Sequence, residues 1–180
     1  MRFSAALDTA YSQSSPDTIA FTFIGITAER KCVVLDERVY NNRDLKIPLS
    51  PSDIPPEFVR FLEVNRNLWG FARDVYIDSA DQATITECQK YKRLTGCIYN
   101  FIPAFKKTKI IARIHLQSAW LAAGDFLVLA RCKNYIAEMN IYSWKEDKYE
   151  PEDGNDHCIN SCQYAWLPYK SMIGSVKIEA

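Results

Sequence analysis

The order of its segments is the feature that most restricts the fold of this chain. Three strand-like segments come before the first helix. The segment TIAFTFIGIT, at 18–27, is rich in the β-branched and aromatic residues that are typical of strands. A short apolar run at Phe3–Asp8 precedes it, KCVVLDERVY at 31–40 follows it, and a polar turn occupies Tyr11–Asp17. The chain is therefore predicted to open with an antiparallel meander.

The pattern then changes to strand, helix and strand. A strand at Asp74–Asp78 is followed by a helix over Ala80–Leu94, which Gly96 ends, and by a strand at Cys97–Ile102. This spacing predicts a parallel βαβ crossover. Further helices are expected over 56–68, 108–123, 134–142 and from Asp156 to just before Pro168, and a short strand over 126–130. The predicted fold class is α/β, with a mixed sheet and flanking helices.

Composition predicts one soluble, intracellular domain. The 180 residues are 48% hydrophobic and 24% charged, which is typical of a packed globular domain. Lys and Arg total 22, as do Asp and Glu, so contact with nucleic acid would need a local basic patch. The sequence contains no glycine-rich phosphate loop, signal peptide or membrane-spanning apolar run, and ATP hydrolysis is not expected of this chain. The six cysteines are expected to be reduced and buried.

Two aspartates end predicted strands. Asp8 lies in LDTAY and Asp78 in YIDSA. Active sites of open α/β sheets gather at the carboxyl ends of strands, where two converging carboxylates can bind Mg²⁺ or Mn²⁺. The alternative is that each aspartate only caps a turn or a helix.

The last predicted helix carries a second polar group, in NDHCINSCQYAW. His157 and Asn160 are three residues apart and therefore share a helix face. If this helix packs across the sheet, it completes a cluster with the two strand-end aspartates. The alternative is that Asp153 or Asp156 is an N-cap and His157 an ordinary polar helix residue.

Three segments carry a resemblance to a known family: LDTAYSQSSPDTIAF, VYIDSADQATITEC and EDGNDHCINSCQYAW. In this order and spacing they resemble the nuclease domain of the large terminase subunit of tailed bacteriophages, over essentially the whole chain. The resemblance implies a ribonuclease H-like fold with a mixed five-stranded sheet. It also implies that residues 1–180 are a single nuclease domain, with the ATPase domain of the full-length subunit outside this chain.

By this resemblance, Asp8 and Asp78 match metal-ligand aspartates and His157 matches a histidine beside the metals. Position 160 departs from the family, because Asn160 stands where an aspartate is usual. The implied chemistry is hydrolysis of double-stranded DNA by two Mg²⁺ or Mn²⁺ ions, with Asp8 bridging them and Asp78 and Asn160 completing one ion each. A site with one carboxylate fewer should bind its second ion less well.

The implied role is endonucleolytic cutting of concatemeric viral DNA, with little sequence preference, while the genome is packaged. The implied partners are double-stranded DNA, the small terminase subunit, the portal protein of the procapsid and the ATPase domain. The implied location is the host cytoplasm, at the portal, and not the mature virion. Asn160 supports a different hypothesis, a weakened or silent DNA-binding or docking domain of the motor. A resolvase or transposase would need a full third carboxylate and usually a more basic surface.

DNA contact is assigned to the basic segment before the predicted helix over 108–123. Family members often carry a lysine pair there, and Lys106 and Lys107 match it; Lys109 and Arg113 extend the segment. Lysine contacts to the backbone suit an enzyme that reads little sequence. The alternative is an ordinary charged surface, as is expected of the cluster Lys90, Lys92 and Arg93.

Three other residue groups have weaker functional interpretations. Cys158 and Cys162 form a lone pair beside His157, which is too few ligands for structural zinc, so buried thiols are favoured. Tyr164 and Trp166 are interpreted as core anchors rather than base-stacking groups. Glu37 is a further acidic candidate near the site, with a surface salt bridge favoured.

Overall fold

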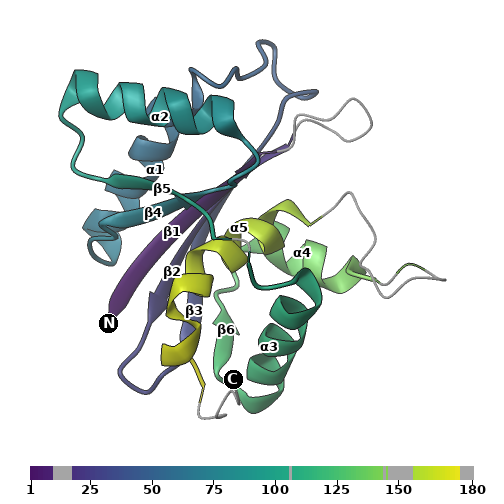
Figure 1. Cartoon of the computed structure of the whole chain (residues 1–180). Coiled ribbons are helices and arrows are strands. Elements are labelled where there is room, and N and C mark those ends of the chain that lie inside the picture. The colour runs from purple at the N-terminus through teal and green to yellow at the C-terminus, as the bar shows by residue number, and fades with distance from the viewer. Residues whose placement is uncertain (10–17, 106, 144, 146–155, 175–180) are drawn as a thin grey trace.

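A computed structural model describes residues 1–9, 18–105, 107–143, 145 and 156–174. These residues form one six-stranded sheet in the order β5-β4-β1-β2-β3-β6 (Figure 1). The strands are β1 (Arg2–Thr9), β2 (Thr18–Ile26), β3 (Cys32–Asn41), β4 (Asp74–Ile77), β5 (Asn100–Pro103) and β6 (Phe126–Val128). The resemblance implied five strands; the sixth is β6, which confirms the short strand predicted over 126–130 and pairs in parallel with the outer edge of β3. Strand β5 also begins three residues later than predicted.

The strand directions bring five carboxyl ends to one edge of the sheet. Strand β2 is antiparallel to β1 and to β3, which confirms the predicted meander. Strand β4 is parallel to both β1 and β5, which confirms the predicted crossover. Strand β6 is parallel to β3, so β2 alone among the described strands runs the other way. The carboxyl ends of β1 and β4 are therefore neighbours.

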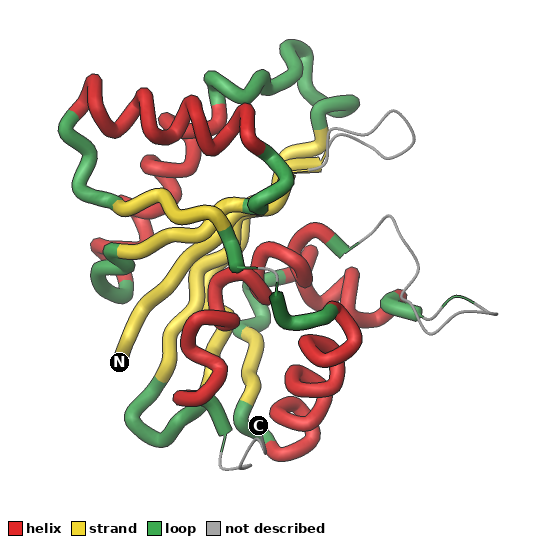
Figure 2. Tube along the Cα trace, viewed as in Figure 1, coloured by secondary structure: helices red, strands yellow, loops and turns green. Residues whose placement is uncertain are grey.

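Helices cover both faces of the sheet (Figure 2). They are α1 (Ile54–Leu68), α2 (Gln82–Thr95), α3 (Ile110–Ala123), α4 (Lys133–Ile141) and α5 (His157–Trp166), followed by a 3-10 helix, η1 (Leu167–Met172). Helices α1 and α2 lie on one face and α3, α4 and α5 on the other (Figure 1). The central strand β2 is buried along its whole length as a result.

The helix ends follow local chemistry. Gly96 and Gly124 adopt the left-handed conformation directly after α2 and α3, where residues with a Cβ are strained. Helix α5 ends before Pro168, as predicted, because a proline nitrogen cannot donate to the helix ladder. Pro168 instead lies in the first turn of η1, where its missing donor costs nothing.

Helix α5 is fastened to the sheet by buried hydroxyl groups. The Ser161 hydroxyl donates to the Ala6 carbonyl at 2.9 Å and lies 2.9 Å from the Thr22 hydroxyl. The Ser4 hydroxyl donates to the Ala165 carbonyl at 2.8 Å. Because these polar groups are buried, losing one partner would leave the other unsatisfied, so they hold the register of α5 on β1 and β2.

The six cysteines are all free, and five of them are buried. Cys97 is the exception to the prediction, because it is only half-buried at the start of the segment that leads to β5. Cys158 and Cys162 belong to α5 and are part of its apolar core, where burial raises the pKa of both thiols. No helix in the described part of the chain is long and apolar enough to cross a membrane.

Candidate active site

The two strand-end aspartates meet at the carboxyl edge of the sheet. Leu7 of β1 pairs with Ile77 of β4, so Asp8 and Asp78 are the next residues on neighbouring parallel strands. The amide of Asp78 donates to the Leu7 carbonyl at 3.3 Å. Asp8 is 4% exposed and Asp78 is 9% exposed. The predicted convergence of the two carboxylates is therefore found in the structure.

Burial makes the ionised form of Asp8 unfavourable. It raises the pKa of Asp8 to about 6, although the hydrogen bond and charge of His157 lower it and the Asp78 charge raises it further. Two carboxylates that repel each other in a buried place favour a proton or a cation between them. This edge of the sheet therefore has the electrostatics of a cation site.

His157 is the first residue of α5 and turns back onto Asp8. Its Nδ1 atom lies 3.0 Å from Oδ2 of Asp8. Burial lowers the pKa of His157, but the hydrogen bond and charge of Asp8 raise it more, and the net shift is upward. Its Nε2 atom is buried without a hydrogen-bond partner in the described part of the chain. The ring is thus held by Asp8 at one nitrogen and is unsatisfied at the other.

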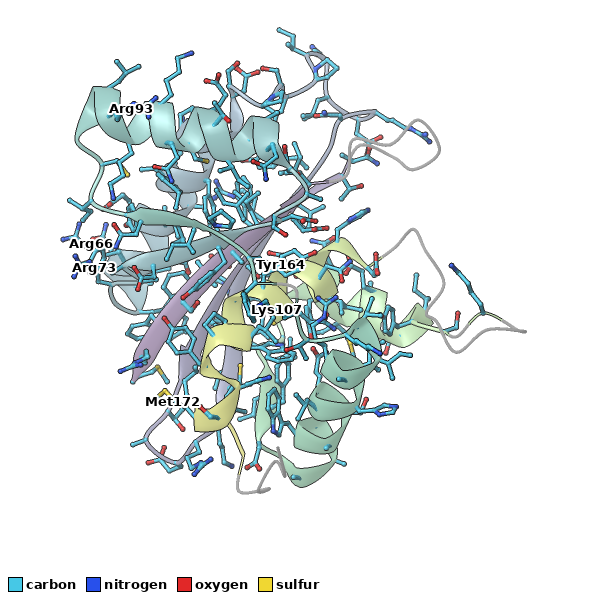
Figure 3. The ribbon with its side chains drawn as sticks, viewed as in Figure 1. Arg66, Arg73, Arg93, Lys107, Tyr164 and Met172 are labelled. Atoms are coloured by element: carbon cyan, nitrogen blue, oxygen red, sulfur yellow. The ribbon has the colours of Figure 1, made fainter. Side chains whose placement is uncertain are left out.

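Tyr164 was missed as a site residue. It is buried, as predicted, but its hydroxyl donates to Oδ2 of Asp78 at 3.2 Å where α5 passes the sheet (Figure 3). The other oxygen of Asp78 accepts from the amide of Ala80 at 2.8 Å. Tyr164 is two helical turns after His157, so the same face of α5 supplies a contact to each aspartate. That spacing is the signal in the sequence that points to Tyr164.

Asn160 lies between these two residues on α5, three after His157 and four before Tyr164. It is half-buried, and its backbone amide donates to the Asp156 carbonyl at 2.8 Å. Helical spacing therefore places position 160 on the side of α5 that faces the carboxyl edge of β1 and β4. An aspartate here would add a third carboxylate to the edge, whereas the amide adds a neutral oxygen.

The donors suit a divalent cation but are few. No group of three His, Cys, Asp or Glu side chains able to hold a metal is found among the described residues. Two carboxylates and an amide carbonyl are oxygen ligands of the type that Mg²⁺ and Mn²⁺ prefer. Asp8, Asp78 and Asn160 offer oxygen ligands of this type, and two of these three side chains can carry a negative charge.

Two glutamates, Glu37 and Glu138, cap the N-termini of α4 and α5. Glu37 accepts from the backbone amides of Asn134 at 2.6 Å and Tyr135 at 2.8 Å, which caps α4. The favoured interpretation of Glu37 as a surface salt bridge is therefore wrong. Glu138 of α4 in turn accepts from the first amides of α5, those of Cys158 and Ile159. Carboxylates favour helix N-termini because the free amides and the helix dipole are positive there.

The predicted caps of α5 turn out differently. Asp156 stands at the N-cap position but makes no side-chain capping bond to the helix. Glu138 of α4 provides the side-chain cap of α5 instead. Asp153 lies outside the described residues, as does Lys106 of the predicted lysine pair. Lys107 is exposed, with its ammonium 5.3 Å from the centre of the Phe105 ring.

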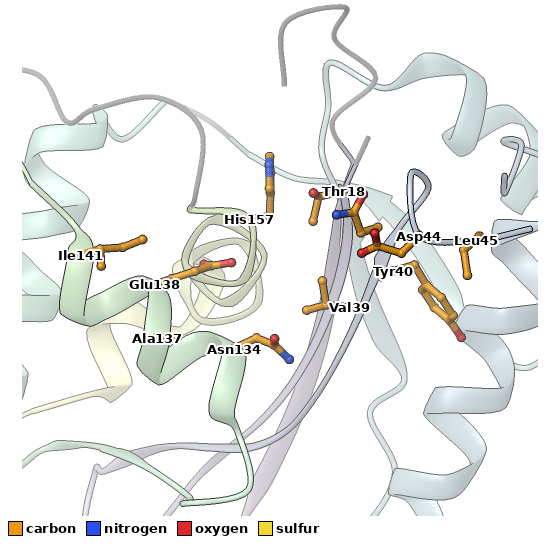
Figure 4. Close-up of a pocket in the computed structure, with 11 residues that line it drawn as sticks. Thr18, Val39, Tyr40, Asp44, Leu45, Asn134, Ala137, Glu138, Ile141 and His157 are labelled. Atoms are coloured by element: carbon orange, nitrogen blue, oxygen red, sulfur yellow. The ribbon is translucent and has the colours of Figure 1, made fainter. Parts of the chain in front are cut away.

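A cavity of about 560 Å³ opens on the other side of His157, between the end of β3 and α4 (Figure 4). Its acidic members are Asp44 and Glu138, and none of its described lining residues is a Lys or Arg. A phosphate backbone would be repelled here. Exposed cations lie instead just before α3, where Lys107 and Lys109 are exposed.

No protein-family model matches this sequence, and no curated protein matches it. Solved structures do share its fold. The large terminase of a thermophilic bacteriophage has a TM-score of 0.74 at 17% identity, over 96% of this chain and 40% of that protein. The chain thus spans about 40% of the length of that terminase.

Isolated nuclease domains match over most of their length. The large terminase nuclease of thermophilic phage G20c with bound magnesium has a TM-score of 0.54 at 13% identity, over 92% of this chain and 81% of that one. It has also been solved with cobalt and with zinc. The human cytomegalovirus terminase nuclease domain has a TM-score of 0.60 at 7% identity, over 92% and 82%.

A yeast mitochondrial Holliday junction resolvase has a TM-score of 0.52 at 11% identity, over 94% of this chain and 79% of that one. The chain therefore has the ribonuclease H-like α/β fold of terminase nuclease domains, with six strands in its sheet. The same fold serves terminase nucleases and a resolvase, so the fold alone does not identify the reaction and the side chains of the site must decide it.

Proposed function

We propose that this chain is a divalent-metal-dependent DNA endonuclease domain that cuts concatemeric viral DNA during genome packaging. The observation that carries the proposal is the meeting of Asp8 and Asp78, two buried carboxylates at the ends of neighbouring parallel strands. Supporting it are the fold of terminase nucleases and the order of the three motifs that resemble that family.

Asp8 and Asp78 would hold Mg²⁺ or Mn²⁺, with Asn160 offering its amide oxygen. A bound divalent ion supplies an activated water and neutralises charge on the scissile phosphate. Tyr164 holds one oxygen of Asp78, which orients that carboxylate before any cation arrives. A site with a full second ion would require the third carboxylate that Asn160 lacks.

His157 would orient a water or transfer a proton through Nε2. Its Nδ1 is engaged with Asp8, which fixes the ring and leaves Nε2 as the reactive nitrogen. The hydrogen bond and charge of Asp8 raise the pKa of His157, which favours the protonated imidazole. The protonation of His157 therefore depends on whether Asp8 is ionised.

DNA would be held through its backbone by Lys107 and, as the sequence predicts, by Lys106. The net charge of the chain is zero, so attraction has to come from such a local group. Lysine contacts to phosphate carry no sequence information, which agrees with cutting of low specificity. The small terminase subunit, the portal and an ATPase domain of the full-length subunit are proposed partners, supported by the match to 40% of a full large terminase.

Asn160 favours a second candidate, a weakened or silent docking domain of the same motor. The two candidates are separated by comparing the natural chain, Asn160→Asp and Asp8→Asn. Plasmid DNA is incubated with each in Mn²⁺, Mg²⁺ or EDTA, and Mn²⁺ binding is measured by calorimetry. Nuclease function predicts cleavage that EDTA abolishes, stronger in Asn160→Asp and lost in Asp8→Asn. No cleavage by either the natural chain or Asn160→Asp, with Mn²⁺ binding unaffected by Asp8→Asn, would favour the docking domain.

A further inference from the structure

A buried arginine on α3 has no ion pair within the described part of the chain. Arg113 lies in the first turns of α3 and is 7% exposed. Its Nε and Nη1 atoms are buried without a hydrogen-bond partner in the described part of the chain. The contact that holds the guanidinium is the face of Tyr164, whose ring centre lies 5.9 Å from Cζ. Tyr164 is the residue that binds Asp78, so Arg113 stands behind the acidic edge of the sheet.

Such burial is unfavourable unless an anion joins the guanidinium. A charged group removed from water loses its hydration, and a cation-π contact replaces only part of it. An arginine whose task was structural would be expected to pair with a carboxylate, as Arg131 does with Asp36 at 3.2 Å. Arg113 has no ion pair with any described residue. Its Nε and Nη1 donors are therefore unsatisfied within the described part of the chain.

The surroundings favour a negative ligand. Helix α3 follows β5, whose end is tied to β4 by a bond from the Ala104 amide to the Ile77 carbonyl, directly before Asp78. Lys107 and Lys109 are exposed just before α3, and the first turn of the helix has no acidic residue. The free amides of this first turn add further positive potential.

We propose that Arg113 is a phosphate-binding residue, whose guanidinium donates to the non-bridging oxygens of one nucleic-acid phosphate at the Asp8 and Asp78 edge. The planar guanidinium matches two phosphate oxygens at once, unlike an ammonium. Exposed lysines would attract the backbone anywhere along this surface, whereas Arg113 is held by Tyr164 and would select one phosphate. This inference rests on the proposed nuclease function and names the group that positions its scissile phosphate.

The first test compares Arg113→Met and Arg113→Lys with the natural residue, in whichever of the natural chain and Asn160→Asp cuts DNA. Arg131→Met is the matched control, because Arg131 is half exposed and pairs with Asp36 rather than with the acidic edge. Arg113→Met should slow single-turnover cleavage by about 100-fold, the loss expected for one donor to a reacting oxygen, and weaken duplex affinity only a few-fold. Arg113→Lys should recover a minor part of the rate. Full-rate cleavage by Arg113→Met would overturn the inference and leave the proposed nuclease intact.

The second test needs no cleavage. Thermal unfolding is followed in EDTA with and without inorganic phosphate. Phosphate should raise the unfolding temperature of the natural chain and of Arg131→Met but not of Arg113→Met. Without phosphate, Arg113→Met should unfold at the same temperature as the natural chain or higher, since it removes an uncompensated charge. A lower unfolding temperature for Arg113→Met, with an undiminished response to phosphate, would show a structural residue and overturn the inference. If no variant cuts DNA but the phosphate response depends on Arg113, the nuclease proposal fails and the anion site stands.

Discussion

Replacing Asp8 with asparagine should stabilise the metal-free protein at alkaline pH. Asp8 is buried, and burial raises its pKa to about 6 from an ordinary value of 3.8. The folded chain therefore binds this proton more tightly than the unfolded chain. The stabilising contribution of protonated Asp8 to the free energy of unfolding is complete below pH 3.8 and is lost as the pH rises through about 6. Asparagine has nearly the same shape and carries no charge at any pH, so Asp8→Asn avoids this loss.

The size of the effect follows from the shift. A difference between about 6 and 3.8, at 1.36 kcal/mol for each pKa unit, is worth about 3 kcal/mol. Asp8→Asn should therefore exceed the natural chain by up to about 3 kcal/mol at pH 8, and by about half as much at pH 5. For a chain of this length, about 3 kcal/mol corresponds to about 6–12 °C in unfolding temperature.

Urea unfolding in EDTA at pH 5 and pH 8 measures this difference directly. The raised pKa of His157 acts in the same direction, because its pairing with ionised Asp8 helps only at the lower pH. Adding Mn²⁺ should stabilise the natural chain, by about 2.7 kcal/mol at a concentration about 100 times the dissociation constant, and leave Asp8→Asn unchanged. If Asp8→Asn is instead less stable than the natural chain by a constant amount at both pH values, burial does not disfavour the ionised Asp8 carboxylate and the prediction is refuted.

Three further substitutions distinguish a residue that supports the candidate metal site from residues that only stabilise the fold. Tyr164→Phe removes the hydroxyl bound to Asp78 and should weaken Mn²⁺ binding severalfold in calorimetry, at a stability cost of about 1 kcal/mol; unchanged Mn²⁺ affinity would contradict the orienting role. Glu37→Gln weakens the cap of α4 and should cost about 1 kcal/mol in urea unfolding while cleavage stays normal, so a loss of cleavage would return Glu37 to the site. Gly174→Ala should cost about 1–3 kcal/mol, since Gly174 has φ +73° and a new Cβ would lie 2.8 Å from Trp120; unchanged stability would show that the turn relaxes.

The local sequence pattern was enough to predict the strands and helices, and to predict that Asp8 and Asp78 lie close together. Runs rich in β-branched and aromatic residues mark strands, and helical spacing with its capping and proline boundaries marks helices, so the meander, the crossover and α5 were all predicted. The meeting of Asp8 and Asp78 followed as well, because the carboxyl ends of neighbouring parallel strands lie at one edge of a sheet. The face shared by His157 and Asn160 followed from helical spacing alone.

Contacts between distant elements were decided by the tertiary structure. The sequence alone is compatible with Glu37 as a surface charge, but in the structure Glu37 accepts from the first amides of α4. It is also compatible with Tyr164 as an ordinary core residue, but α5 crosses β4 and brings the Tyr164 hydroxyl to Asp78. Arg113 belonged to a basic stretch in the sequence, yet the packing of α3 against α5 buries it on Tyr164. Periodicity tells which face of an element is buried, whereas the partner of a polar group depends on which other element covers that face. The sequence by itself therefore determined the strands, the helices and the two aspartates, and only the assembled sheet and helices decided what binds each of them.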